Sequence, residues 1–247
     1  MGFEQNRFGW APFWAAAAVL SLVAAVYFSG REPVSNVPEA IGRVGFQTIF
    51  SLVSAVSGSQ SFNSPASSGI DAAELWKHSL TTAFACKFIA EDIEAESNLM
   101  FTAGLLHDIG RVVLAQAKGA DYGRIVNGAA AAGADSTALE KSNYGFTHAD
   151  VGACLMETWK LPAALVQAVR FHHQPASGGS VKKLAAGICV GNAQAHRFEH
   201  PADALSRPNT ELEGALSLLG LGNRHLELYD EQMQENLNFV NALIQMR

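Results

Sequence analysis

FTAGLLHDIGRVVL, residues 101–114, is the stretch that decides the expected fold of this chain. Apolar residues recur at helical spacing on both sides of His107 and Asp108, which predicts one helix from about 98 to 117. A histidine and a carboxylate in the middle of an apolar helix need partners, because a buried charge is tolerated only when it is paired or bound to a metal. The stretch therefore predicts both a buried helix and a polar site within it.

Two capping boxes predict the starts of further helices. Residues 71–74 read Asp-x-x-Glu and open a long amphipathic helix that carries His78. Residues 147–150 read Thr-x-x-Asp and place His148 at the first position of another helix. Both histidines are therefore expected to project from helices, as His107 does.

The remainder of the chain also favours helices, and no stretch predicts a strand. A helix from Pro162 is expected to carry the doublet His172-His173 before Pro175 stops it. Other helices are expected at 35–44, 46–56, 121–132 and 180–198, and in two terminal segments that begin near 209 and are separated at 220–222. The predicted fold class is all-α.

Composition points to a folded chain in a reducing compartment. Of the 247 residues 49% are apolar and 16% are charged, which excludes a disordered protein. The formal net charge is −6 and no run of basic residues occurs, so direct nucleic-acid binding is not expected. The three cysteines are widely separated and form no CxxC pair, which excludes a disulfide framework. We predict a cytoplasmic protein.

Residues 11–29 leave two interpretations open. This segment carries no charge, and its length is close to the ~20 residues that span a bilayer. It is rich in alanine, which favours membrane insertion much less than leucine or phenylalanine does. A buried helix is therefore the preferred interpretation, and an inner-membrane tether is the alternative.

Histidines and one aspartate recur in four consecutive predicted helices. Neutral imidazole and carboxylate together suit iron, manganese or zinc better than calcium. A pair of such ions would lower the pKa of a bound water and hold phosphate oxygens. A single histidine on an apolar helix is more often a core or cap residue, so the prediction depends on the whole set. One residue of the doublet is expected to face solvent, and His196, His200 and His225 are interpreted as surface residues. The predicted metal ligands are His78, His107, Asp108, His148, His172 and His173.

Four ordered motifs resemble the HDOD domain, the HD-related output domain of bacterial signalling proteins. They are LWKHSL (75–80), FTAGLLHDIGRVVL (101–114), FTHADVGACLMETWKLP (146–162) and FHHQP (171–175). VYFSGREPVSNVPEAIGRVG (26–45) is similar to the end of the family's N-terminal helical subdomain. The resemblance extends over about residues 19–200. It implies an HD-domain-like helical bundle with a truncated N-terminal subdomain: 1–60 as the remnant, 70–200 as the core and 201–247 as a C-terminal extension.

The resemblance also implies a site and a function. In HD-GYP enzymes, which are relatives of this family, a lone His, the HD pair, a further His and an HH doublet hold divalent metal, and these correspond to the six predicted ligands. Asn192 stands near the place of an aspartate ligand in those enzymes, and Arg111 stands where they have a lysine. Both residues are predicted to contact a ligand. No GYP motif follows the doublet.

These departures favour a regulatory function over catalysis. We expect a signal-transduction module with one or two divalent ions (Fe, Mn or Zn) that binds a signalling protein or a small nucleotide and that forms homo-oligomers. The alternative is a metal-dependent phosphohydrolase similar to cyclic-dinucleotide phosphodiesterases.

Overall fold

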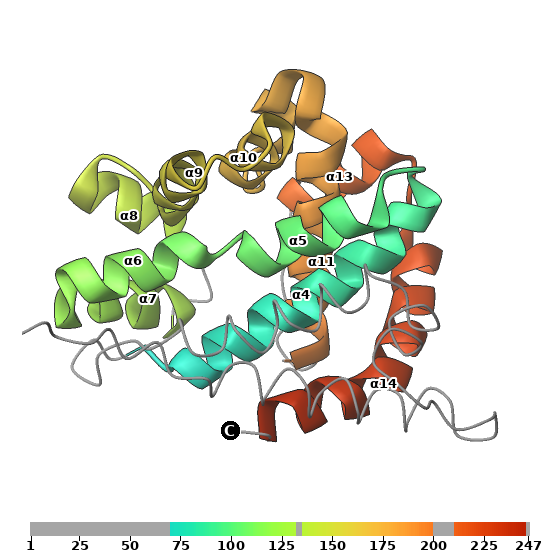
Figure 1. Ribbon diagram of the computed structural model, residues 1–247, viewed down its shortest axis with the longest axis horizontal. Coiled ribbons are helices and arrows are strands. Elements are labelled where there is room, and N and C mark those ends of the chain that lie inside the picture. The colour runs from blue at the N-terminus through green and yellow to red at the C-terminus, as the bar shows by residue number, and fades with distance from the viewer. Residues whose placement is uncertain (1–69, 132–134, 200–209, 246–247) are drawn as a thin grey trace, which may run out of the picture. The chain divides into compact units, whose positions relative to one another are not determined.

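The computed structural model describes residues 70–131, 135–199 and 210–245, and within these ranges every regular element is a helix (Figure 1). This confirms the predicted all-α class. Contacts divide the chain into two units, Met1–Ser61 and Phe62–Arg247, and all described residues belong to the second unit.

Several predictions fall on the first unit. The uncharged segment 11–29 and the helices predicted at 35–44 and 46–56 lie outside the described residues. In the described part of the chain, no helix combines the length and hydropathy that crossing a bilayer requires.

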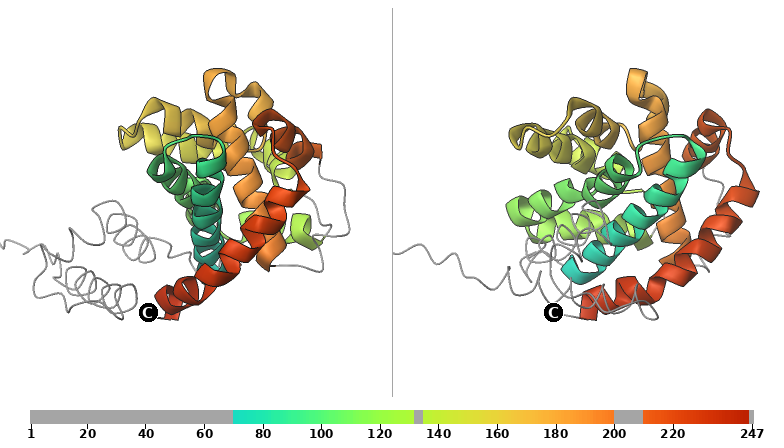
Figure 2. Two further views of the ribbon diagram at one scale, coloured as in Figure 1. Left: turned by 90° about the vertical axis from the view of Figure 1, so that its right-hand side faces the viewer. Right: turned by 45° about the vertical axis from the view of Figure 1, so that its right-hand side comes forward.

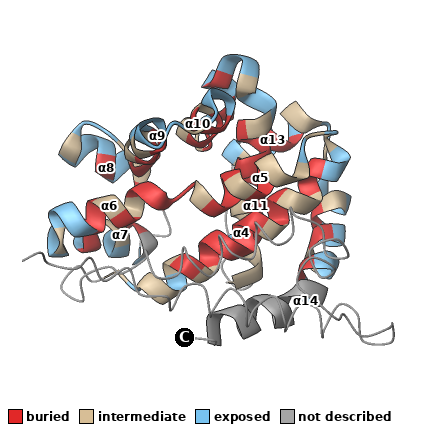
Figure 3. Cartoon of the chain, in the orientation of Figure 1, coloured by how far each residue is buried: buried red, intermediate tan, exposed pale blue. Residues whose placement is uncertain are grey.

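Three helices pack closely to form the centre of the second unit: α4 (Ala72–Asp92), α5 (Ser97–Leu106) and α11 (Lys182–Glu199). Glycines permit this approach. A Cβ atom on Gly104 of α5 would lie 2.8 Å from a backbone carbon of α4, and one on Gly191 of α11 would lie 2.5 Å from a sulfur atom of α4. The sides of these helices that face one another are buried (Figure 3). α4 therefore has a well-packed face on which His78 is positioned.

The helix predicted at 98–117 is in fact two helices, and the prediction of one continuous helix was wrong. α5 ends at Leu106 and α6 (Ile109–Lys118) begins after a break at 107–108, where Asp108 has φ −101° and ψ 10°. α6 packs on α9 (His148–Thr158) so closely that a Cβ atom on Gly110 would lie 1.9 Å from the carbonyl oxygen of His148. This contact requires α6 to leave the axis of α5. The HD pair consequently occupies the break.

The doublet is also placed differently from the prediction. α10 (Ala163–Arg170) ends before it, so 172–173 lie in the turn between α10 and the 3-10 helix η2 (Pro175–Val181). The predicted helix near 121–132 is α7 (Ala120–Ala131). α8 (Thr137–Tyr144) was not predicted.

Both predicted N-caps are present, but of the two predicted capping boxes only that at 147–150 is complete. The Asp71 carboxylate accepts hydrogen bonds from two backbone N–H groups at the start of α4, at 2.8 and 3.2 Å. At the start of α9, the Thr147 hydroxyl accepts from the Asp150 N–H and the Asp150 carboxylate accepts from the Thr147 N–H, which completes a capping box. Each cap fixes the first turn of a helix that carries a candidate site histidine.

The C-terminal helices pack on the same centre. α13 (Thr210–Leu219) is followed by Gly220, which has a positive φ of 71°. α14 (Asn223–Gln245) begins after this break, which confirms the separation predicted at 220–222. α13 contacts α11, and α14 contacts both α4 and α11, as the views in Figure 2 show. Their buried apolar side chains join those of α4 and α11 in one cluster that includes Ile89, Val190, Ala215, Leu216, Leu226 and Tyr229.

Candidate metal centre

The six side chains predicted from the sequence converge on one place in the fold. Neighbouring imidazole rings in the set lie 4.0–5.6 Å apart between centroids. The set comprises His78 in α4, His107 and Asp108 in the break between α5 and α6, His148 at the start of α9, and His172 and His173 in the turn after α10. Two helices and two connecting segments therefore assemble a single cluster, and its role as a metal site stays a prediction.

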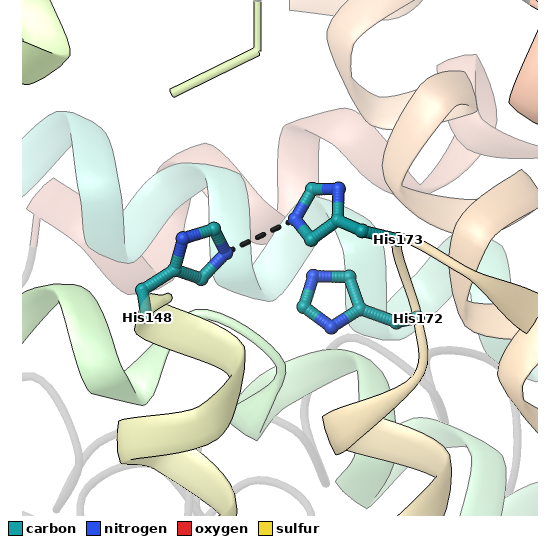
Figure 4. A group of neighbouring side chains, drawn as sticks. All are labelled: His148, His172 and His173. Carbon is teal, nitrogen blue, oxygen red and sulfur yellow. Dashed lines mark hydrogen bonds between the residues drawn. The ribbon is translucent and has the colours of Figure 1, made fainter. Parts of the chain in front are cut away.

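Neither histidine of the doublet faces solvent, contrary to the expectation that one would. His172 is 1% exposed, and the side chain of His173 is 11% exposed. The reason is the turn after α10: outside a helix, two consecutive side chains can both point inward, and their rings lie 4.0 Å apart. Figure 4 shows both rings beside His148, with the Nε2 atoms of His148 and His173 3.0 Å apart.

Backbone carbonyl groups fix the tautomer of two buried histidines. His107 Nδ1–H donates to the Gly104 carbonyl oxygen at 2.7 Å, and His172 Nδ1–H donates to the Val169 carbonyl oxygen at 2.6 Å. The lone pair of each neutral ring is therefore on Nε2. Burial lowers the pKa of His107 well below its ordinary value and that of His172 to about 4, so both rings are neutral at pH 7. Both Nε2 atoms are buried and accept no hydrogen bond from any described residue.

Glu140 of α8 holds His148 from behind. Its carboxylate lies 2.8 Å from His148 Nδ1 and accepts a hydrogen bond from the His148 backbone N–H at 2.7 Å. It also accepts from the hydroxyl groups of Tyr122 and Ser136 at 2.8 and 2.9 Å. Burial by itself raises the pKa of Glu140, but the hydrogen bonds and charge of His148 outweigh it and lower that pKa to about 2. A carboxylate behind a histidine is the usual way that proteins orient a metal-binding imidazole.

The sequence analysis missed Glu140 because it did not predict α8. The signal was a short polar stretch, 136–144, with a serine one turn before the glutamate. That pattern is common on exposed helices, and nothing local indicates that Glu140 is fully buried.

Asp108 lies between a histidine and an arginine. Its Oδ1 is 3.0 Å from His148 Nε2, and its Oδ2 forms an ion pair with Arg111 Nε at 2.8 Å. Burial alone raises the pKa of Asp108, but the Arg111 guanidinium and the neighbouring histidines lower it well below the ordinary value. Arg111 Nη1 also donates to Ser136 Oγ at 3.1 Å. Arg111 is thus part of the cluster, and it occupies one oxygen of the only carboxylate in the predicted ligand set.

His78 lies at the edge of the cluster and contacts α11 through both ring nitrogens. Its Nε2 is 2.9 Å from Asn192 Oδ1, and its Nδ1 is 2.9 Å from Glu199 Oε2. The ring of His196 lies 4.3 Å from that of His78. His196 is exposed, as predicted for a surface residue, but its neighbour was not foreseen. His200 lies outside the described residues.

The donor set fits a divalent transition metal. His78, His107 and Asp108 form one group whose ligand atoms lie within 4.8 Å of one another, and the buried Nε2 of His107 belongs to this group. Three histidines of the set, 148, 172 and 173, place one nitrogen each within 4.8 Å of one another, as three ligands of one ion require. Nitrogen donors with one carboxylate suit iron, manganese or zinc.

Comparison with known proteins identifies the family of this chain. The family model of the HDOD domain matches residues 15–175, which include all six predicted ligands. The chain belongs to the HDOD family. An uncharacterized protein of Treponema pallidum (strain Nichols) is 24% identical to this HDOD chain over 177 residues, which are 70% of this chain. The HDOD chain spans about a third, 34%, of the length of that curated relative.

Solved structures share the fold. A "Putative phosphohydrolase" from Shewanella amazonensis superposes with a TM-score of 0.69 at 23% identity, covering 99% of this chain and 88% of the other. A "Putative signal transduction protein" from Marinobacter aquaeolei gives 0.72 at 23% identity, covering 96% and 52%. An HDOD domain protein with unknown function from Geobacter sulfurreducens gives 0.67 at 18% identity, covering 97% and 87%. These similarities support the helical HDOD fold of the described residues.

Proposed function

We propose that this HDOD chain is a regulatory module of bacterial signal transduction that retains a cation centre and acts by binding a signalling protein or a small nucleotide. One observation carries the proposal: the Nε2 atoms of His107 and His172 are buried, hold their lone pairs and accept no hydrogen bond within the described residues. Leaving a buried acceptor unsatisfied costs about 1–3 kcal/mol. A bound cation removes that cost for both atoms.

The charge of the cluster supports a cation. A metal ion on His148 Nε2 displaces the proton that the neighbouring carboxylates favour there, so Asp108, Glu140 and Arg111 together leave the ligand groups with one net negative charge. A divalent ion (Fe, Mn or Zn) could be held by Asp108, His107, His148, His172 and His173. Its two positive charges would change the net charge of the cluster from negative to positive. We call these five residues the inner centre. Such an ion supplies Lewis acidity and lowers the pKa of a bound water when it is present.

Arg111 and Asn192 favour binding over hydrolysis. Hydrolysis of a phosphodiester by two ions needs enough ligands to hold both ions close together, and Arg111 already holds one oxygen of Asp108. On its Nε2 side, which faces Asn192, His78 meets a neutral amide in place of a carboxylate. These contacts support a single ion in the inner centre and a regulatory function.

Metal analysis of the untagged protein tests the inner centre. We expect one equivalent of Fe, Mn or Zn per chain that depends on His172, because His172→Ala removes a buried nitrogen ligand. His225→Ala is the matched control, since His225 lies apart from the cluster and its Nδ1 accepts from the Gly222 N–H. Equal metal content in the wild type and His172→Ala would contradict the inner centre.

A phosphodiesterase assay of the metal-loaded protein separates the two functions. We expect binding of a cyclic dinucleotide or a protein partner without turnover. Turnover that is lost in Asp108→Ala would favour the phosphohydrolase and overturn the regulatory proposal.

A further inference from the structure

We propose that His78, His196 and Glu199 form a second divalent cation site, the outer site, which fits Zn²⁺ and keeps one coordination position open to solvent. The three side chains come from α4 and from the last turn of α11. His196 and Glu199 lie beyond residues 15–175, the part of the chain that the HDOD model matches. The outer site shares no residue with the five of the inner centre, but it borders that centre, because His78 also lies within ligand distance of His107 and Asp108.

The distances suit one ion. Each of the three residues offers a ligand atom within 4.8 Å of the other two, and His78 Nδ1 lies 2.9 Å from Glu199 Oε2. Ligand atoms at about 2.0–2.2 Å from a tetrahedral zinc lie roughly 3.4 Å from one another. Small rotations of the side chains therefore bring the three atoms to bonding distance. His196 and Glu199 are three residues apart on one helix, so they share a face.

Asn192 prepares His78 for this role. Its Oδ1 accepts a hydrogen bond from His78 Nε2–H at 2.9 Å, which places the lone pair of the neutral ring on Nδ1. That lone pair then faces the Glu199 carboxylate. Without a metal, a proton on Nδ1 joins His78 and Glu199 in an ion pair at 2.9 Å, and a cation at this place would displace that proton. His78 consequently presents its ligand atom to α11 and turns its N–H toward Asn192.

Glu199 supplies an independent observation. Its side chain is 8% exposed, and its Oε1 is buried without a hydrogen-bond partner within the described residues. An unsatisfied carboxylate oxygen is costly to bury. A cation bound at this carboxylate offsets that cost.

The ligand set indicates how the site would work. Two histidines and one glutamate are a known zinc ligand set that leaves the fourth position to water or to an exchangeable ligand. His196 is exposed, so that position is reached from solvent. The outer site is therefore suited to a reversibly bound Zn²⁺ that recruits an anionic group.

Zn²⁺ titration of the full-length untagged protein, with Co²⁺ absorption as a spectroscopic check, tests the outer site. We expect His196→Ala and Glu199→Gln to weaken one class of Zn²⁺ binding by at least on the order of 100-fold, because outer-shell changes alone cost 10–100-fold. The change in Co²⁺ absorption that belongs to this site is lost with it. His225→Ala is the control and keeps wild-type binding. His196 is exposed and Glu199→Gln keeps the side-chain volume, and circular dichroism checks that both variants fold.

The outcomes separate the two sites. Wild-type stoichiometry and affinity in both His196→Ala and Glu199→Gln overturn the outer site. If His172→Ala still binds Zn²⁺ in a manner that depends on His196, the outer site stands whether or not the inner centre exists. If the only Zn²⁺ binding is lost in His172→Ala and kept in His196→Ala, the inner centre stands and the outer site is overturned.

Discussion

The inner centre and the outer site use similar residues but hold them by different means. In the inner centre, backbone carbonyl groups and a fully buried carboxylate fix His107, His172 and His148. In the outer site, His78 is held by side chains of one helix, and its neighbour His196 is exposed. The first arrangement is rigid and closed, and the second is adjustable and open. How firmly a histidine is oriented for metal binding therefore depends more on the groups that surround it than on its presence alone.

Glu140→Ala should have the largest effect on the inner centre. The change removes the acceptor that holds His148 Nδ1, the His148 N–H and two hydroxyl groups, so we expect a loss of about 3–5 kcal/mol in the free energy of unfolding. Urea denaturation measures it. Metal binding at the inner centre should be lost while the outer site persists.

Glu157→Ala is the matched control for this variant. Glu157 forms an exposed ion pair with Arg170, and such pairs contribute about 0–1 kcal/mol. A cost for Glu140→Ala as small as the control's would show that Glu140 does not anchor His148.

A smaller effect is expected from Gly110→Ala. The new Cβ would lie 1.9 Å from the His148 carbonyl oxygen, which forces α6 and α9 apart and costs about 1–3 kcal/mol or more. Thermal unfolding measures the loss, and metal analysis should show a weaker inner centre. Gly128→Ala in α7 is the control: nothing lies within 4 Å of its Cβ, so it should be neutral or stabilise by about 0.5–1 kcal/mol. Equal stability of the two variants would contradict the close approach.

Thr147→Ala is the mildest of these changes and tests whether the inner centre and the outer site respond separately. It removes the N-cap of α9 next to His148 and should cost about 1 kcal/mol in the free energy of unfolding. We expect weaker metal binding at the inner centre and unchanged binding at the outer site, measured in one titration of the same preparation. A parallel loss at both sites would mean that they are coupled.

Much of the fold could be predicted because its signals are local. The capping box at Thr147, the N-cap at Asp71 and the break at Gly220 each depend on residues within one turn of the chain. The convergence of the six candidate ligands was predicted from helical spacing and from the family's motifs. The structure brings these side chains together, and their role as metal ligands stays a prediction.

The remaining features depend on contacts between distant residues. The helix break at the HD pair follows from the approach of Gly110 to the His148 carbonyl, 38 residues away in sequence, and apolar spacing carries no trace of it. Glu140 resembles a surface residue until α8 packs it against His148. His196 was interpreted as a surface residue because only the fold shows that it lies beside His78.

The carbonyl groups behind His107 and His172 have a consequence for mutational tolerance. A backbone oxygen is supplied by any amino acid, so a substitution at Val169 that keeps α10 intact leaves the His172 tautomer unchanged. Random mutagenesis should therefore inactivate these two ligands mainly through codons 107 and 172 themselves. His78, by contrast, is positioned by the side chains of Asn192 and Glu199, so a substitution of either residue would disturb it.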